Sequence, residues 1–213
     1  MQARRLLSLS GAAIVALVAS VVVLGNDTPG SDAHGSTIAA YYHDHQVASI
    51  AATFLIGLVA PLLVAFGVTL ASARRGEDDG HSSASELVLL GGAVLAAAAF
   101  LVTAAFQFAL ADVPDKLSGG ALQALNVLFN DMWAAWNPAL GVMMLGAAAT
   151  LRPCGGSRRV LGSVAAAIGV ALFVPFADFV ALLATGVWFV AASVVLYRNQ
   201  APAPRYAAQP RTA

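Results

Sequence analysis

Long uncharged apolar runs, separated by short polar segments, make up most of the chain. Each run has at least the roughly 20 residues that a helix needs to cross a hydrocarbon core about 30 Å thick. The last run, residues 160–197, would form a helix about 57 Å long and must therefore fold back on itself. Pro175 and Asp178 mark the turn, because proline interrupts helical hydrogen bonding and a carboxylate inside a bilayer is costly.

This pattern predicts an all-α fold, a polytopic transmembrane bundle of six helices. We expect one transmembrane domain over residues 1–200, followed at 201–213 by a disordered cytoplasmic tail that is rich in proline and alanine. A cleaved signal peptide is the alternative for the first run, since two arginines precede it and small residues end it. The expected passes cover residues 6–25, 47–73, 87–111, 131–151, 159–175 and 179–197.

The basic residues give the predicted bundle a direction. Of the 11 Lys and Arg residues, all except Lys116 lie at alternate gaps between the apolar runs. Because Lys and Arg are retained on the cytoplasmic side of a membrane, we expect a plasma-membrane protein with both termini in the cytoplasm. The turn at Pro175 is then expected at the outer surface. The residues on the predicted cytoplasmic side are Arg4, Arg5, Arg74, Arg75, Arg152, Arg158, Arg159, Arg198, Arg205 and Arg211.

Composition narrows the class of protein further. Hydrophobic residues make up 59% of the chain and charged residues 10%, which is typical of membrane proteins. The net charge is zero, so no basic surface for nucleic acid is expected. The single cysteine, Cys154, has no second cysteine with which to form an intramolecular disulfide. A solvated cytoplasmic loop is expected to contain Glu77, Asp78, Asp79 and Glu86.

Small residues predict where helices approach one another. The third run contains the pair Gly91 and Gly92 and an alanine cluster at residues 96–99, and the fifth run contains Gly162 and Gly169. Glycine and alanine allow the backbones of neighbouring membrane helices to come close together. These positions are therefore expected to serve packing.

A short helix with histidines is predicted in the first outer segment. Ser36 is expected to cap a helix over residues 37–45 that lies at the membrane interface. Imidazole and carboxylate groups bind metals, so His43 and His45, with His34 upstream, form an alternative metal site. Residues i and i+2 point about 200° apart on a helix, so only an extended segment would place both imidazoles on one face.

The most ordered polar pattern is a stripe of amides on the predicted fourth helix, leading into the fourth apolar run. Gln123, Asn130 and Asn137 are spaced by seven residues, and Asn126 lies between the first two. On one continuous helix this spacing places all four on one face, running from the outer surface into the membrane. Gln107, in the preceding run, is expected at a similar depth.

Two interpretations of the amides remain open. In the first, they line an outward-facing polar cavity that binds a small solute or a lipid headgroup. In the second, Gln123 and Asn126 are solvated, while Asn137 and Gln107 form interhelical hydrogen bonds that contribute roughly 0.6 kcal/mol each. The candidate ligand-binding residues are Gln107, Asn126, Asn130, Asn137, Asp131 and Asp178.

Several classes of chemistry lack the residues that they need. No histidine or lysine lies inside an apolar run, which excludes an intramembrane bis-histidine haem and a retinal-type Schiff base. The chain also lacks a P-loop, a His-Glu-x-x-His motif and a Gly-x-Ser-x-Gly elbow. Asp131 and Asp178 are expected at the outer ends of helices, with a proton relay as the alternative. We therefore predict that the protein is not an enzyme.

Two segments resemble those of an uncharacterised family of six-pass actinobacterial integral membrane proteins. One is Ile38-Ala-Ala-Tyr-Tyr-His-Asp-His45, before a helix that ends in Leu70-Ala-Ser-Ala-Arg-Arg75. The other is Val174-Pro-Phe-Ala-Asp-Phe-Val180, followed by Gly186-Val-Trp-Phe-Val190 and Val194-Val-Leu-Tyr-Arg198. Relatives commonly have Pro-x-Trp-Leu-Gly before helix five, whereas here Pro153 is followed by Cys154-Gly155-Gly156. The resemblance implies the six-pass topology and brings no catalytic residues.

The sequence thus predicts a non-enzymatic accessory, regulatory or structural component of the membrane. Its expected partners are the lipid bilayer and either another membrane protein or further copies of this chain, with no nucleic acid and no cofactor. A small-solute or lipid-handling transporter is the alternative.

Overall fold

The computed structural model describes residues 7–25, 27–72, 84–112, 114 and 116–199, and this part of the chain is helical without a strand. The prediction of an all-α fold is confirmed. The predicted tail at 201–213 lies outside the described residues. The helices are α2 (Ser10–Leu24), α3 (Gly35–Asp44), α4 (Gln46–Ser72), α5 (Ala84–Asp112), α6 (Gly119–Asn130), α7 (Trp133–Leu151), α8 (Gly156–Ala171) and α9 (Asp178–Asn199).

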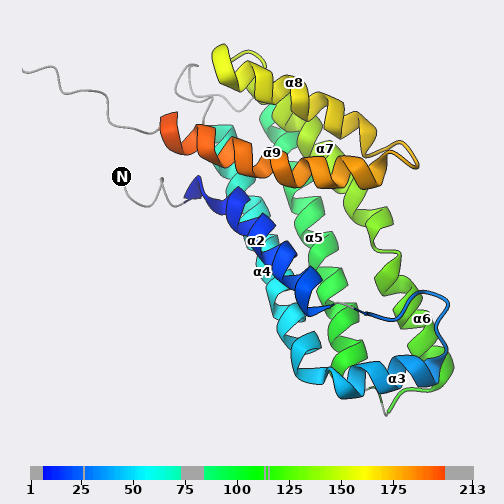
Figure 1. The fold of residues 1–213 in the computed structure, drawn as a ribbon. Helices are drawn as coiled ribbons and strands as arrows, with labels where there is room; N and C mark the ends of the chain where they lie inside the picture. Colours follow the sequence, from blue (N-terminus) through cyan, green and yellow to red (C-terminus); the bar gives the residue numbers. More distant parts are fainter. Residues whose placement is uncertain (1–6, 26, 73–83, 113, 115, 200–213) are drawn as a thin grey trace, which may run out of the picture.

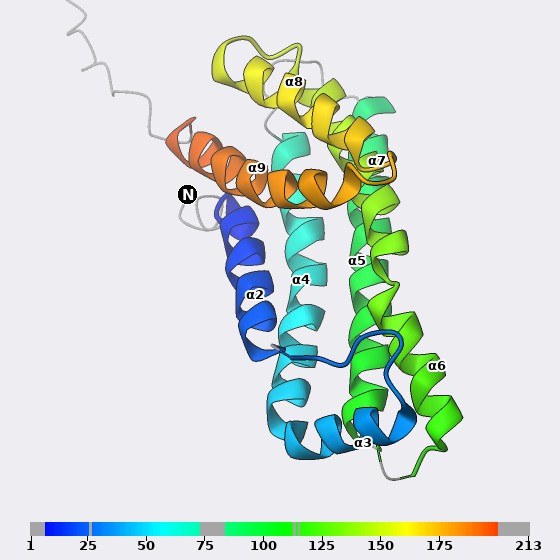
Figure 2. The same cartoon turned by 45° about the vertical axis from the view of Figure 1, so that its right-hand side comes forward.

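The helices form an elongated bundle in which α4, α5 and α7 run side by side (Figures 1 and 2). Helix α2 packs against α4 and α9, and α8 packs against both α7 and α9. At one end of the bundle α6 extends α7, and α3 lies across that end against α6 (Figure 2). At the other end, α8 and α9 form a hairpin that crosses α4 and α5 obliquely (Figure 1).

Within the described residues, four helical segments are long and apolar enough to cross a membrane. These segments support a membrane-embedded bundle, because about 20 apolar residues span the hydrocarbon core. The shorter α2 is also apolar, whereas α8, the counterpart of the expected pass at 159–175, ends at Ala171. The four segments are Gln46–Ser72, Ala84–Asp112, Gly119–Leu151 and Asp178–Arg198.

Glycines set the distance between α5 and α7. A Cβ atom at Gly92 would overlap the backbone nitrogen of Met143, and one at Gly146 would overlap the backbone nitrogen of Leu89. The neighbouring Gly91 has no atom within 4 Å of such a Cβ. Of the predicted pair, therefore, Gly92 serves the close approach and Gly91 does not.

The predicted glycine face in the fifth run also serves packing, here between α8 and α7. A Cβ atom at Gly162 would lie 2.8 Å from the backbone nitrogen of Arg152. One at Gly169 would lie 3.1 Å from the backbone nitrogen of Leu145. Both distances are shorter than ordinary van der Waals contact, so side chains larger than hydrogen would push the two helices apart.

The segment at residues 27–45 and helix α6 form a unit that we call the α3–α6 lobe. Its apolar core consists of Ile38, Tyr42, Leu110, Ala111 and Leu122, which come from α3, α5 and α6. The start of α3 lies against the start of α6, because a Cβ at Gly35 would be 2.5 Å from the Cα of Gly119. This contact needs glycine at position 35, where α3 begins.

The structure corrects the expected start of α3. The helix covers Gly35–Asp44, and the residue before it, His34, makes no side-chain capping bond. Ser36 lies inside the first turn, so the prediction that it caps the helix is wrong. The helix starts earlier because Gly35 packs on α6, a contact that local sequence does not reveal.

The structure also corrects the expected environment of Glu86. Glu86 is 2% exposed and belongs to the first turn of α5, so its assignment to a solvated loop is wrong. An acidic side chain is favoured there because the amino end of a helix carries partial positive charge. The other acidic residues of that prediction lie outside the described residues: Glu77, Asp78 and Asp79.

Candidate functional site

Amide side chains of α6 hold the first connecting segment in place. Asn126 Nδ2 donates to the carbonyl oxygens of Gly30 at 2.7 Å and Pro29 at 3.3 Å. Asn130 Nδ2 donates to the same Pro29 oxygen at 3.3 Å. Gln123 Nε2 donates to a further carbonyl of this segment, that of Ala33, at 3.4 Å. The three amides thus fix a non-helical stretch of backbone against the helix.

Asn126 is fully buried at 0% exposure, so the expectation that it is solvated is wrong. The reason is that the segment at residues 27–34 packs over it, and its side chain donates to the Pro29 and Gly30 carbonyls of that segment. The Oδ1 atom of Asn126 is buried without a hydrogen-bond partner among the described residues.

Tyr42 carries the most strongly perturbed titratable group of the α3–α6 lobe. It is 1% exposed, and its hydroxyl has no hydrogen-bond partner in the described part of the chain. Burial raises the pKa of the Tyr42 phenol well above its usual value, and the neighbouring Tyr41 raises this pKa further. The phenol is therefore protonated at neutral pH.

A second polar contact joins α7 to the beginning of α9. Asn137 Nδ2 donates to Asp178 Oδ2 at 3.0 Å. Asn137 is 3% exposed, and its Oδ1 atom is buried without a partner in the described structure. Asp178 is half-buried in the first turn of α9, where a carboxylate also benefits from the helix dipole. Asn137 thus forms the interhelical bond of the second interpretation.

Sequence reasoning missed a polar contact between α5 and α7. Trp136 Nε1 donates to Thr103 Oγ1 at 2.9 Å, and the indole ring stacks on Phe100 with centroids 5.3 Å apart. Thr103 is 1% exposed. A lone threonine inside an apolar run was the available signal, because a buried hydroxyl needs a hydrogen-bond partner.

The six candidate ligand-binding residues do not share one site. Asn126 and Asn130 bind the segment at 27–34, Asn137 and Asp178 bind each other, and Asp131 is exposed. Gln107 is buried at 5% exposure, and its Oε1 atom has no partner among the described residues.

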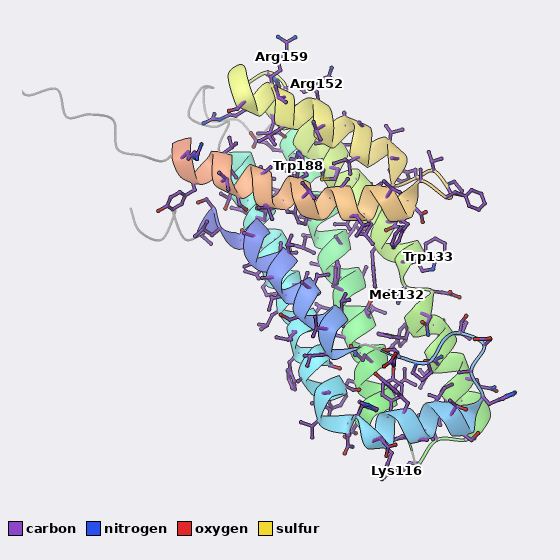
Figure 3. The ribbon with its side chains drawn as sticks, viewed as in Figure 1. Lys116, Met132, Trp133, Arg152, Arg159 and Trp188 are labelled. Atoms are coloured by element: carbon purple, nitrogen blue, oxygen red, sulfur yellow. The ribbon has the colours of Figure 1, made fainter. Side chains whose placement is uncertain are left out.

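The predicted amide stripe is interrupted between α6 and α7. The backbone forms a turn at Asp131 and Met132, where α6 ends and α7 has not begun. Figure 3 marks this junction by Met132 and Trp133. The expectation of one continuous stripe is therefore wrong. Spacing by seven residues aligns side chains only while the helix is unbroken.

One surface hollow in the described structure is apolar and open. It is an open groove of about 430 Å³ between α4 and α5. None of the six candidate residues lines it. Its lining consists of Thr53, Phe54, Gly57, Leu58, Ala104, Ala105 and Phe108.

His45, which follows the last residue of α3, contacts a tyrosine of that helix. The ring of His45 stacks on that of Tyr41 with centroids 4.5 Å apart, and His45 Nδ1 lies 3.0 Å from the Tyr41 carbonyl oxygen. His43 is part of the helix, and position i+2 points to a different side. Within the described residues, no group of three or more His, Cys, Asp or Glu side chains is arranged to hold a metal.

Comparison with known proteins identifies no relative of this chain. No protein-family model, curated protein or solved structure matches this chain. The contacts of the polar side chains are therefore the basis for a proposed function. In these contacts, amide groups bind backbone carbonyls and one carboxylate.

Proposed function

We propose that the protein is a non-enzymatic component of the plasma membrane, acting as an accessory, regulatory or structural partner of other membrane proteins or of its own copies. Its six helical membrane segments are α2, α4, α5, α6 with α7, α8 and α9, and both termini lie in the cytoplasm. Membership of the six-pass family that two of its segments resemble is part of this proposal.

The observation that supports this proposal is that the buried amide side chains bind other parts of the same chain. Asn126 binds the backbone of residues 29 and 30, and Asn137 binds Asp178. Both side chains are more than nine-tenths buried, with exposures of 0% and 3%. Their donors are therefore committed to holding the chain together, as expected for a protein whose role is to present a stable membrane surface.

The positions of basic residues support the proposed orientation. Arg152 and Arg159 lie at one end of the bundle and Lys116 at the opposite end (Figure 3). Because arginine is retained on the cytoplasmic side, the end with Arg152 and Arg159 is proposed to face the cytoplasm. The α3–α6 lobe then faces outward.

A labelling experiment tests this orientation. The variant Cys154→Ala removes the single cysteine, and Lys116→Cys or Arg159→Cys then introduces one thiol at either end. We expect a membrane-impermeant maleimide added to intact cells to label position 116 and to spare position 159 until the membrane is permeabilised. Labelling of 159 alone in intact cells would invert the proposed topology.

Association tests the proposed role. The full chain is cross-linked in native membranes and extracted in polymer-bounded lipid discs. We expect a stable self-association, or a second membrane protein at a constant ratio, because a non-enzymatic bundle acts through its contacts. A strict monomer without a cross-linked partner at native abundance would refute the proposed role.

A further inference from the structure

The turn between α8 and α9, residues 172–177, presents an entirely apolar outer surface. Phe176 at its tip is 99% exposed, and Phe173 and Val174 are each nearly half exposed. The surface continues onto α9 through Phe179 and Val180, both 66% exposed. Exposure of these bulky side chains to water is unfavourable, because transfer of each one out of water is favourable by roughly 1.5–3 kcal/mol.

Most backbone N–H groups of this turn donate hydrogen bonds within the chain. The N–H groups of residues 172, 173, 174 and 177 donate to carbonyl oxygens three or four positions earlier. Pro175 has no N–H group to satisfy, and Phe176, at φ 72°, carries the remaining one. Irregular backbone tolerates a lipid environment only when its polar groups are paired within the protein, and the N–H groups of this turn nearly meet that condition.

The single ionisable group of the turn points toward the protein. Asp178 is the only charged residue from 172 to 180. Its Oδ2 accepts a hydrogen bond from Asn137 Nδ2 at 3.0 Å, on α7. Phe173 packs on the same helix, where a Cβ at Gly141 would lie 2.5 Å from its ring. One carboxylate oxygen of Asp178 and the ring of Phe173 thus face α7, while Phe176 at the tip is exposed.

The length of α8 fixes how deep the turn lies. Arg158 and Arg159 belong to the first turn of the helix, which ends at Ala171. The stretch from 160 to 171 rises about 18 Å at 1.5 Å per residue, against a hydrocarbon core of roughly 30 Å. In both ribbon views the turn lies beside α7 and does not reach the level of α6 and α3 (Figures 1 and 2).

We propose that the α8–α9 turn lies within the acyl chains of the bilayer, and that α8 and α9 form a hairpin that enters and leaves the membrane from the arginine side. This proposal rests on the proposed membrane assignment and orientation. It replaces the expectation that the Pro175 turn lies at the outer surface, and with it the counting of α8 and α9 as two separate passes. The partner of the exposed apolar tip is lipid hydrocarbon, and Asn137 holds the Asp178 carboxylate away from it.

Spin-label accessibility tests the proposal. Cysteines are introduced one at a time in the Cys154→Ala background as Phe176→Cys, Leu183→Cys and Lys116→Cys, and the labelled full chains are placed in phosphatidylcholine–phosphatidylglycerol nanodiscs. Leu183 is 59% exposed on α9 and serves as the lipid reference. Lys116, at the end of the bundle, serves as the aqueous reference. Collisions with oxygen report lipid, and collisions with a water-soluble nickel complex report solvent.

We expect the label at 176 to match the label at 183, with loss of nickel collisions relative to the label at 116. A label at 176 that collides with nickel as the label at 116 does would overturn the proposal while leaving the membrane assignment intact. If the label at 183 also collides with nickel in this way, the membrane assignment of α9 fails, and the proposed function fails with it.

Discussion

Replacing Gly92 by alanine is expected to lower the free energy of unfolding by about 3 kcal/mol, the upper part of the range for overpacked cores. The added methyl would overlap the backbone nitrogen of Met143, which cannot rotate away as a side chain can. The two helices must therefore separate, and the reciprocal contact of Gly146 with Leu89 would be lost with them. Gly92→Leu is expected to prevent folding altogether.

Gly91→Ala is the matched control. It makes the same chemical change one residue away, at a position where a Cβ would meet no atom within 4 Å. We expect stability equal to the parent or higher by up to about 1 kcal/mol, because alanine favours helix over glycine. Unfolding of both variants in mixed micelles, followed by circular dichroism during titration with SDS, measures the difference. Equal stability of the two variants would contradict the α5–α7 contact described above.

Asn126→Leu is expected to destabilise the α3–α6 lobe by about 2 kcal/mol, since it removes two hydrogen bonds that contribute about 1 kcal/mol each. The loss is limited to these two bonds, because the Pro29 carbonyl retains the bond from Asn130 and the Gly30 carbonyl retains the bond from the Ala33 N–H group. Hydrogen–deuterium exchange in nanodiscs measures the effect. Exchange of the amides at residues 27–34 should rise strongly, while that of α4 and α5 stays unchanged.

Gln123→Leu provides the comparison within the same lobe. Gln123 is half-buried and makes one long bond of 3.4 Å to the Ala33 carbonyl, so its replacement should change exchange only slightly. Asn126→Asp keeps the size of the side chain but places a carboxylate beside two carbonyl oxygens. It should therefore destabilise the lobe at least as much as Asn126→Leu does. If all three variants exchange like the parent, Asn126 does not hold the segment.

The candidate site was predictable only in part. Asn137 was expected to bond across helices, and it does so with Asp178. The partners of Asn126 were not predictable, because they are backbone carbonyls 96 and 97 positions away in the chain. A backbone carbonyl leaves no mark in a sequence, so an amide that binds one looks the same as an amide exposed to water.

The sequence by itself determined the helical class, the approximate extent of the apolar segments and the glycines that bring helices together. These are local properties, because the length of an apolar run and the absence of a side chain have the same meaning wherever the chain folds. Only the tertiary structure decided that α6 and α7 are separated by a turn at Asp131 and Met132, which of two adjacent glycines lies in the α5–α7 contact, and how far the α8–α9 turn reaches along the bundle. Those features depend on which surfaces meet, and contact between segments distant in sequence is set by packing.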